Sequence, residues 1–179
     1  MRGAPAALLA TAVAIALLAE GAASGAPVLP AAALGAPTAA AGQSHLAVIV
    51  NRSNPIASLS RRELRALFRG DRMAWSHGRR VTIVLREPGQ PERTAALRLI
   101  YGMSEADLTR HFLHQTFNGA GGGGPRTLST ADGVKRFVFN VPGAIGLIRL
   151  ADVDDTVKVV SVDGMVPGDA AYALLVGAP

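Results

Sequence analysis

The sequence predicts one α/β domain whose sheet is largely parallel and flanked by helices. Three observations support this fold class. Short apolar runs typical of strands buried on both faces alternate with segments whose apolar residues recur at helical spacing. Glycine, proline and helix-capping residues separate the two kinds of segment. The chain has 179 residues, enough for one such domain, and strands that alternate with helices favour a parallel sheet.

The N-terminal segment has the pattern of a secretory signal peptide. Arg2 precedes an apolar run over residues 6–19, and small residues follow over 21–26. A membrane anchor is the competing interpretation, but a membrane-spanning helix needs about 20 strongly apolar residues. Because this run is shorter and consists mostly of alanine, we expect cleavage, after Ala26 or after Ala41.

The segment that follows has no periodicity. Residues 27–44 are mainly Ala, Pro and Gly, which predicts a disordered leader between a signal peptide at 1–26 and a folded domain at 45–179. The chain contains no cysteine. This excludes a disulfide framework, thiolate metal sites, a cysteine nucleophile and a lipid anchor on an N-terminal cysteine. We therefore expect a soluble protein of the periplasm.

The first predicted strand and helix come next. Residues 46–50 form a continuous apolar run, and polar residues and a proline over 51–55 break the chain after it. Ser60 and Glu63 have the spacing of a capping box, and Gly70 ends the helix that they begin. The apolar residues of this helix at the expected spacing are Leu64, Leu67 and Phe68.

A second strand and two further helices follow. The strand covers residues 81–85, which are again apolar or β-branched. A turn at 88–89 separates it from a helix that carries Pro91 in its first turn. Gly102 ends this helix, and Ser104 begins the next one.

The last helix lies behind a glycine-rich segment, residues 119–125. We expect Ser129 to cap this helix and Pro142 to follow its end. Two more apolar strands, 144–148 and 157–162, complete the predicted domain.

Charge is distributed unevenly along the chain. Sixteen Arg and two Lys oppose 13 acidic residues, for a net charge of +5. Residues 52–98 hold 11 Arg and four acidic residues, whereas 150–179 hold five Asp and one Lys. A basic half suits an anionic small ligand, a nucleic acid or an acidic partner, and it also fits an ordinary solvated surface. Export and the 4% aromatic content argue against a nucleic acid.

The loop after the strand 81–85 is the main candidate for a binding site. It leaves the carboxyl end of a strand and opens a helix, where unpaired N–H groups and the helix dipole attract anions. Arg86 is placed to bind an oxyanion with two N–H groups. Gln90, Arg93 and Thr94 lie around the first turn of the helix and can donate further hydrogen bonds.

Other features compete with this interpretation or extend it. Glu87 and Glu92 place two negative charges in the same loop, and acids at a helix start are ordinary partners of the dipole. Ser129 and Thr130, at a helix start behind the glycine-rich segment 119–125, are a second pair of candidate ligands. A glycine loop can cradle phosphate, but this one lacks a Gly-Lys-Ser/Thr ending, so a flexible surface loop is the alternative.

Nothing in the sequence indicates catalysis, a metal or a cofactor. His111 and His114, with Asp107 one turn earlier, have the spacing of metal ligands but lack a fourth partner, so we interpret them as exposed polar positions. A nucleophile elbow, a Ser-x-x-Lys pair and a dinucleotide fingerprint are all missing. Trp75 has no companions that suggest chemistry and is interpreted as a core residue.

One family resemblance runs in order through nearly the whole predicted domain. The segments that carry it are 46–55, 59–70 with Trp75, the strand ending in Arg86, Tyr172-Ala173-Leu174 and, most specifically, Val141-Pro142-Gly143-Ala144-Ile145-Gly146-Leu147-Ile148. Together they resemble the phosphate-type periplasmic solute-binding proteins of ABC transporters, in the type II periplasmic-binding-protein superfamily.

The resemblance implies a fold in which two α/β lobes clamp an oxyanion, and the predicted mature chain is similar to the second lobe alone. In the family the strand is followed by Arg-Ser-Asp and then by Ser-Gly-Thr-Thr. Here Arg86 matches directly and Thr94 only loosely. Glu87 replaces a hydroxyl donor with a negative charge, and Pro91 removes an N–H group, so phosphate specificity does not carry over.

These observations predict an exported, non-catalytic solute-binding protein of the phosphate or oxyanion ABC-transporter type, with a weak anion site at Arg86. Its expected partners are a small phosphate-like oxyanion and a membrane transporter or another envelope protein. We expect no nucleic acid, no cofactor and no insertion into the membrane after signal cleavage. The alternative is a ligand-free, lobe-like interaction module that docks on an envelope partner such as a sensor kinase, a porin or a transporter.

Overall fold

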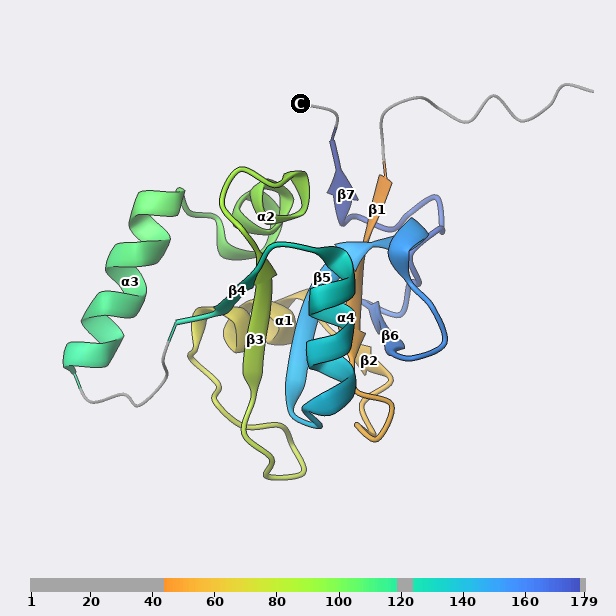
Figure 1. Ribbon diagram of the computed structural model, residues 1–179, viewed down its shortest axis with the longest axis horizontal. Helices are drawn as coiled ribbons and strands as arrows, with labels where there is room; N and C mark the ends of the chain where they lie inside the picture. The colour runs from red at the N-terminus through yellow and green to blue at the C-terminus, as the bar shows by residue number, and fades with distance from the viewer. Residues whose placement is uncertain (1–43, 119–123, 178–179) are drawn as a thin grey trace, which may run out of the picture. The chain divides into compact units, whose positions relative to one another are not determined.

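A mixed β-sheet forms the middle layer of the protein (Figure 1). A computed structural model describes residues 44–118 and 124–177. The path of paired strands runs β2–β6–β1–β5–β3–β4, and β7 pairs with the start of β1. The strands are β1 (Ser44–Val50), β2 (Ser58–Leu59), β3 (Thr82–Arg86), β4 (Arg126–Leu128), β5 (Ala144–Arg149), β6 (Lys158–Val162) and β7 (Leu175–Val176).

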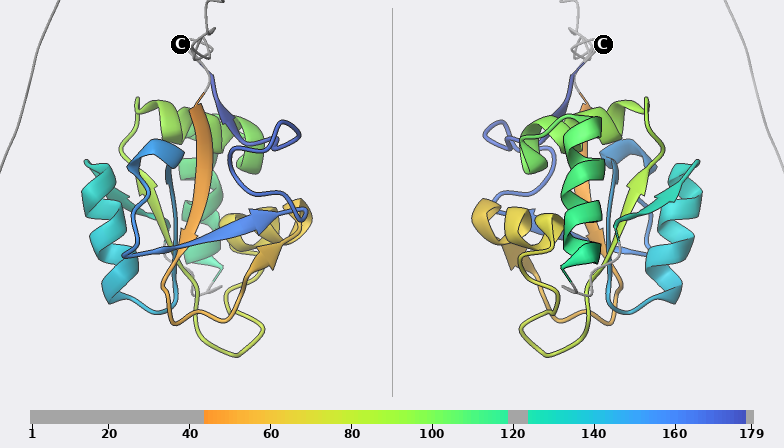
Figure 2. Two further views of the ribbon diagram at one scale, coloured as in Figure 1. Left: turned by 90° about the vertical axis from the view of Figure 1, so that its right-hand side faces the viewer. Right: turned by 90° about the vertical axis from the view of Figure 1, so that its left-hand side faces the viewer.

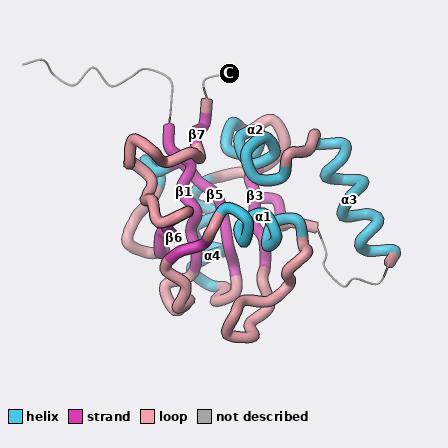
Figure 3. The backbone as a smooth tube through the Cα atoms, turned by 180° about the vertical axis from the view of Figure 1, so that it is seen from behind, coloured by secondary structure: helices cyan, strands magenta, loops and turns pink. Residues whose placement is uncertain are grey.

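Helices cover both faces of the sheet, which confirms the predicted α/β class. They are α1 (Arg61–Arg69), α2 (Pro91–Ala96) with its π-helical continuation η1 (Leu97–Tyr101), α3 (Glu105–Phe117), α4 (Ala131–Asn140) and the 3-10 turn η2 (Leu150–Asp152). Figure 2 shows α4 on one side of the sheet and α1 on the other. Seen from behind in Figure 3, α1 and α2 lie over the face that α4 does not cover, and α3 stands to one side.

One strand gives the sheet its mixed character. β1 pairs antiparallel with β5, β6 and β7, whereas β3 is parallel to both β4 and β5, and β2 is parallel to β6. All the other strands of the path therefore point opposite to β1, and the sheet is largely parallel, as predicted. The direction of β1 escapes sequence reasoning because an apolar run buried on both faces looks the same in either direction.

Two hydrophobic clusters lie on the two faces of β1. Leu46, Val48 and Val50 belong to the cluster under α1, α2 and α3, and Ala47 and Ile49 belong to the cluster under α4. All five side chains are fully buried. The predicted core position of Trp75 is confirmed as well, since its ring is buried in the first cluster.

The predicted helix boundaries are largely confirmed, with one correction. The capping box of α1 is complete: the Ser60 hydroxyl accepts from the Glu63 N–H, and the Glu63 carboxylate accepts from the Ser60 N–H. The cap of α4, however, is Thr130 and not Ser129. The Thr130 Oγ1 accepts from the Gly133 N–H at 2.9 Å. Serine and threonine are both good N-cap residues, so the position at which β4 ends decides which of the two caps α4.

Two short strands, β2 and β4, were not expected from the sequence, and a third, β7, lies just after the segment that resembles the closing strand of the family. β2, β4 and β7 are two or three residues long, too short to show the alternation that identifies a strand. Tyr172–Leu174, one of the segments that carry the family resemblance, lies directly before β7. This segment is tied to β1 because the Leu46 N–H donates to the Leu174 carbonyl, and the Tyr172 hydroxyl donates to the Leu46 carbonyl, both at 2.8 Å.

The predicted signal peptide (1–26) lies outside the described residues, as does the predicted leader up to residue 43. Most of the glycine-rich segment, residues 119–123, lies outside them too. Within the described residues, no helix combines the length and the apolar character needed to cross a bilayer.

Two glycines in the segment Val141–Ile148 lie where a side chain would clash with neighbouring atoms. A Cβ added to Gly143 would lie 2.1 Å from the carbonyl oxygen of Arg80, and a Cβ on Gly146 would lie 2.8 Å from the Val134 Cγ1 of α4. The Gly143 carbonyl also accepts the Trp75 indole N–H at 3.0 Å. Glycine is therefore required where the entry to β5 touches the backbone before β3 and where α4 packs on β5.

We predict that Gly146→Ala destabilises the protein by about 1–3 kcal/mol, because the new methyl group overpacks the contact between β5 and α4. Urea denaturation measures this change. Gly124→Ala is the matched control: its Cβ would meet only Phe112, at 3.6 Å, so its effect should stay within about 0.5 kcal/mol. Equal stabilities of the two variants would contradict the packing argument.

Candidate functional site

Three parallel strands end at the same edge of the sheet and bring the predicted binding loops together. Arg86 ends β3, and its register partner is Leu128, the last residue of β4. The Glu87 N–H continues this ladder by donating to the Leu128 carbonyl at 3.1 Å. β5 runs parallel to β3 on its other side and ends at Arg149. We call this region the carboxyl edge, and ligands in open α/β sheets gather at such edges.

Arg86 lies at the centre of the carboxyl edge with most of its side chain buried. Its guanidinium donates from Nη2 to the Gln90 Oε1 at 3.1 Å. The Glu92 Oε2 is 4.0 Å from its Nε, and the Arg86 side chain is 11% exposed. Nε and Nη1 are buried, and neither has a hydrogen-bond partner among the described residues. Arg86 therefore keeps two unused donors at this edge.

Glu92 is the acidic partner of two arginines. Its side chain is 6% exposed, and its Oε1 forms an ion pair of 2.7 Å with the Nε of Arg149, in addition to the longer approach of Oε2 to Arg86. The sequence identified Glu92 as an opposing charge but missed Arg149. A signal was available, because Arg149 follows the apolar run 144–148 just as Arg86 follows the run 81–85.

Arg93 is occupied by contacts within the protein. Its Nε donates to the Glu105 Oε2 at 3.0 Å, its Nη2 pairs with the other oxygen of the same carboxylate, and its Nη1 donates to the Arg86 carbonyl at 3.0 Å. The residue is buried. The two-point pairing joins α2 to α3, and the bond to the Arg86 carbonyl ties α2 to the end of β3. The geometry therefore gives Arg93 a positioning role for the Arg86 backbone.

Gln90 and Thr94 differ in what they can offer a ligand. Gln90 is the N-cap of α2 but makes no side-chain cap, because its Oε1 accepts from Arg86. Its Nε2 donates to no group among the described residues, so its amide hydrogens face no competing acceptor. The Thr94 hydroxyl donates back to the Gln90 carbonyl at 3.2 Å, on the exposed surface of α2.

Ser129 and Thr130 lie at the same edge, directly after β4. Both are exposed. The Thr130 oxygen accepts the Gly133 N–H as the cap of α4, which leaves its hydroxyl hydrogen available as a donor. The structure thus brings Arg86, Gln90, Ser129 and Thr130 to one edge, although they come from loops about 40 residues apart in the sequence.

The two histidines considered as metal ligands lie in different surroundings. The Nε2 of His111 is hydrogen-bonded to the Arg69 carbonyl at 2.8 Å, and His114 is exposed. The Ser104 hydroxyl donates to Asp107, which lowers the pKa of that carboxyl below its usual value. Among residues 44–118 and 124–177, no group of three or more potential ligands is arranged to hold a metal ion.

The fold is similar to solved structures of phosphate-transport proteins. A phosphate ABC transporter substrate-binding protein from Clostridium perfringens, solved with bound phosphate, superposes with a TM-score of 0.63 at 21% identity, over 76% of this chain and 54% of that one. PstS from Borrelia burgdorferi superposes with a TM-score of 0.58 at 14% identity, over 76% of this chain and 56% of that one. An ABC-type phosphate transport receptor from Vibrio cholerae superposes with a TM-score of 0.55 at 19% identity, over 70% of this chain and 49% of that one.

These likenesses confirm the predicted resemblance at the level of the fold. The chain spans about half the length of these structural neighbours. No protein-family model matches the sequence, and no curated protein matches it either.

The contacts of Arg93 lead to a stability prediction. Replacing its guanidinium in Arg93→Met leaves the Glu105 carboxylate and the Arg86 carbonyl without their donors, which should cost about 1–3 kcal/mol. Urea denaturation measures the loss. Arg98→Met, at an exposed position one helical turn further along, should change stability by less than about 0.5 kcal/mol. A stability loss no larger than that of the control would contradict this structural role of Arg93.

Proposed function

We propose that this protein is an exported, non-catalytic solute-binding protein of the phosphate or oxyanion ABC-transporter type. Its anion site is the carboxyl edge, where Arg86 is the main ligand and Gln90, Ser129 and Thr130 donate further hydrogen bonds. Arg93 and Thr94, also predicted from the sequence as ligands, support the site by holding the backbone around it. The transporter that receives the solute, or another envelope protein, is the expected macromolecular partner.

The observation that carries this proposal is the pair of buried Arg86 nitrogens without a hydrogen-bond partner. Buried guanidinium nitrogens are ordinarily satisfied, and an oxyanion oxygen is a strong acceptor for an N–H group that lacks one. The likeness of the fold to phosphate-binding proteins makes an inorganic oxyanion the first ligand class to examine.

Glu92 explains why we expect weak binding. Its carboxylate already neutralises part of the charge on Arg86 and Arg149, so these three groups together attract an incoming anion with about one net positive charge. The anion also has to approach a buried carboxylate of the same sign. Affinity in the micromolar to millimolar range is consistent with this arrangement, on the order of −4 to −8 kcal/mol.

The proposal predicts that phosphate stabilises the purified protein against thermal unfolding. A ligand at 100 times its dissociation constant adds about 2.7 kcal/mol, which raises the midpoint by several degrees at roughly 2–4 °C per kcal/mol. The measurement compares phosphate-free buffer with phosphate, sulfate and other oxyanions. Arg86→Ala should abolish the shift.

Arg62→Ala is the matched control, because Arg62 is an exposed arginine of α1. It should leave the phosphate shift unchanged. If no oxyanion raises the midpoint of a protein that unfolds cooperatively, or if the two arginine variants behave alike, the proposed site is wrong.

Export is tested separately. Expression with the complete N-terminus in a bacterial host should yield a periplasmic protein that begins at Pro27 or at Gly42, the residues after the two predicted cleavage points. N-terminal sequencing and the intact mass identify the start. A chain that keeps Met1 and stays with the cytoplasmic fraction would contradict export.

The second candidate function is a ligand-free interaction module, and Glu92 favours it by occupying the cationic edge. Glu92→Gln separates the two functions. Without the carboxylate, Arg86 and Arg149 repel each other, so the midpoint of thermal unfolding should fall in phosphate-free buffer. If the protein binds a solute at this edge, phosphate should then raise the midpoint by more than it does in the unmodified protein. If phosphate does not raise the unfolding midpoint of this variant either, the interaction module is favoured.

A further inference from the structure

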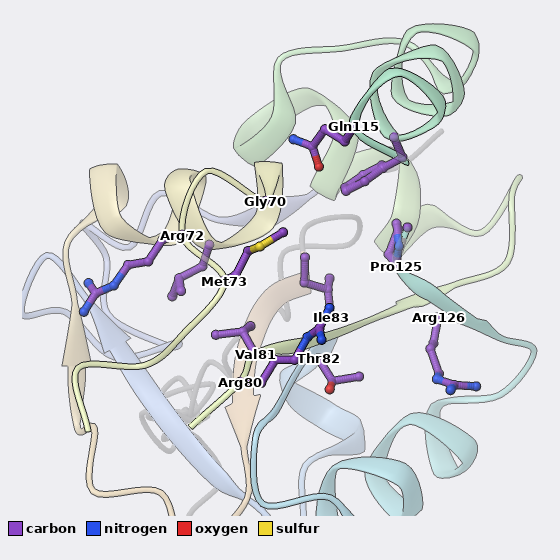
Figure 4. Close-up of a pocket in the computed structure, with 13 residues that line it drawn as sticks. Gly70, Arg72, Met73, Arg80, Val81, Thr82, Ile83, Gln115, Pro125 and Arg126 are labelled. Carbon is purple, nitrogen blue, oxygen red and sulfur yellow. The ribbon is translucent and has the colours of Figure 1, made fainter. Parts of the chain in front are cut away.

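The charged residues on the outward face of α1 are all arginines. The inward face packs on the core through its three apolar residues, Leu64, Leu67 and Phe68. Leu67 also lines a cavity of about 420 Å³ that α1 shares with β3 and α3 (Figure 4). Because a helix has about 3.6 residues per turn, Arg62, Arg65 and Arg69 lie together on the face that points away from these side chains. We call these three arginines the basic stripe.

The neighbouring helix η1 adds a further arginine beside the basic stripe. The Arg65 Nη2 donates to the Leu99 carbonyl at 3.3 Å, which holds this side chain against η1. Arg98 directly precedes Leu99 and is exposed. Arg69 lies at the other end of the stripe, where its Nε is buried and no group among the described residues accepts a hydrogen bond from it. The surface therefore presents several guanidinium groups over two neighbouring helices.

The basic stripe lacks acidic partners, whereas the arginines at its borders have them. Arg61 pairs with Asp163 at 3.5 Å, and Arg72 pairs with Glu63 at 3.8 Å. None of the three stripe arginines forms an ion pair within residues 44–118 and 124–177. Asp71, the next acidic residue along the chain, lies beyond the end of the helix. Like charges three or four residues apart destabilise a helix, so a negatively charged surface outside the protein would relieve this repulsion.

The composition of this face favours a charged bilayer over a protein as the occupant. Protein interfaces have a buried centre that is rich in apolar and aromatic side chains and poor in charges. None of the large apolar side chains that are exposed in the described part of the chain belongs to α1 or η1; they are Leu113, Phe117, Phe139 and Val166. Anionic lipid headgroups, in contrast, attract each arginine separately and need no apolar centre.

We propose that the basic stripe docks the protein on the surface of a bilayer that contains anionic phospholipids. Its guanidinium groups pair with the lipid phosphates, whose oxygens match the planar donor geometry of arginine. The apolar face of α1 stays packed in the core, so the protein lies on the headgroups and does not insert. This contact is independent of the proposed anion site, because the basic stripe shares no residue with the carboxyl edge. It keeps the protein close to membrane-bound partners.

A fluorescent label reports which face of the full-length protein meets the bilayer. The chain has no cysteine, so a single introduced one carries a unique label. Ala66→Cys places the label within the basic stripe, and Asn140→Cys places it at the exposed end of α4, on the other side of the sheet. Vesicles made of equal parts phosphatidylcholine and phosphatidylglycerol contain a trace of lipid with a spin-labelled headgroup, which quenches a nearby label. The Ala66→Cys label should be quenched far more than the Asn140→Cys label, and phosphatidylcholine vesicles should not produce this difference.

Charge variants test the arginines themselves. Arg62→Gln with Arg65→Gln should weaken vesicle binding about 10- to 30-fold, at roughly fivefold per charge removed. Arg62→Lys with Arg65→Lys keeps the charge and should retain most of the binding. The matched control is Arg126→Gln with Arg136→Gln, which removes the same charge from exposed residues beside α4 and should change binding by less than about twofold. Salt at about 1 M, where the Debye length is about 3 Å, should abolish the quenching.

Arg86→Ala separates the basic stripe from the carboxyl edge. It should leave vesicle binding unchanged while it abolishes the phosphate shift, and loss of vesicle binding in this variant would place the headgroups at the carboxyl edge and overturn the proposal. Equal quenching of the two labels, or quenching that Arg62→Gln with Arg65→Gln leaves unchanged, would overturn it too. So would binding of polyglutamate through the basic stripe without binding of vesicles, since that result assigns the surface to an acidic protein.

Discussion

The complete burial of residues 46–50 in β1 is the constraint on which the rest of the architecture depends. Residues 46–50 expose none of their surface, so layers must cover both faces of this strand and neighbours must pair with both of its edges. α4 supplies one layer, and α1, α2 and α3 supply the other. Because the covering helices connect strands that run in one direction, β3, β4 and β5 end together, and the polar loops gather at one edge. The site is thus a consequence of how the core is covered.

The same burial shapes the electrostatics of that edge. An arginine that is nine-tenths withdrawn from water loses hydration that only hydrogen bonds and opposite charge can replace. Glu92 supplies the opposite charge for Arg86 and Arg149, and Glu105 supplies it for Arg93. Internal carboxylates therefore allow the arginines to be buried, and they also lower the attraction for an external anion. Stability of the folded chain and strength of anion binding draw on the same charges.

Most of the local structure could be predicted from the sequence, but only part of the candidate site could. Helix ends were predictable where the chemistry is local, as in the capping box of Ser60 and Glu63 and the left-handed Gly70 that ends α1. The cap at Thr130 was not, since neighbouring Ser129 is as good a cap by type and the end of β4 selects between them. Arg86 was found because it directly follows an apolar strand.

The partners of the arginines needed the fold. Arg93 and Glu105 are 12 residues apart on different helices, and Arg149 meets Glu92 only because β5 and β3 are neighbours in the sheet. No spacing rule links such residues, so sequence reasoning treated Arg93 as a free donor. An open edge also limits what the proposed anion site can do alone. Water at such an edge screens charge with an effective dielectric far above that of a closed cavity, so tight binding of an oxyanion requires a second surface that covers the edge and excludes water.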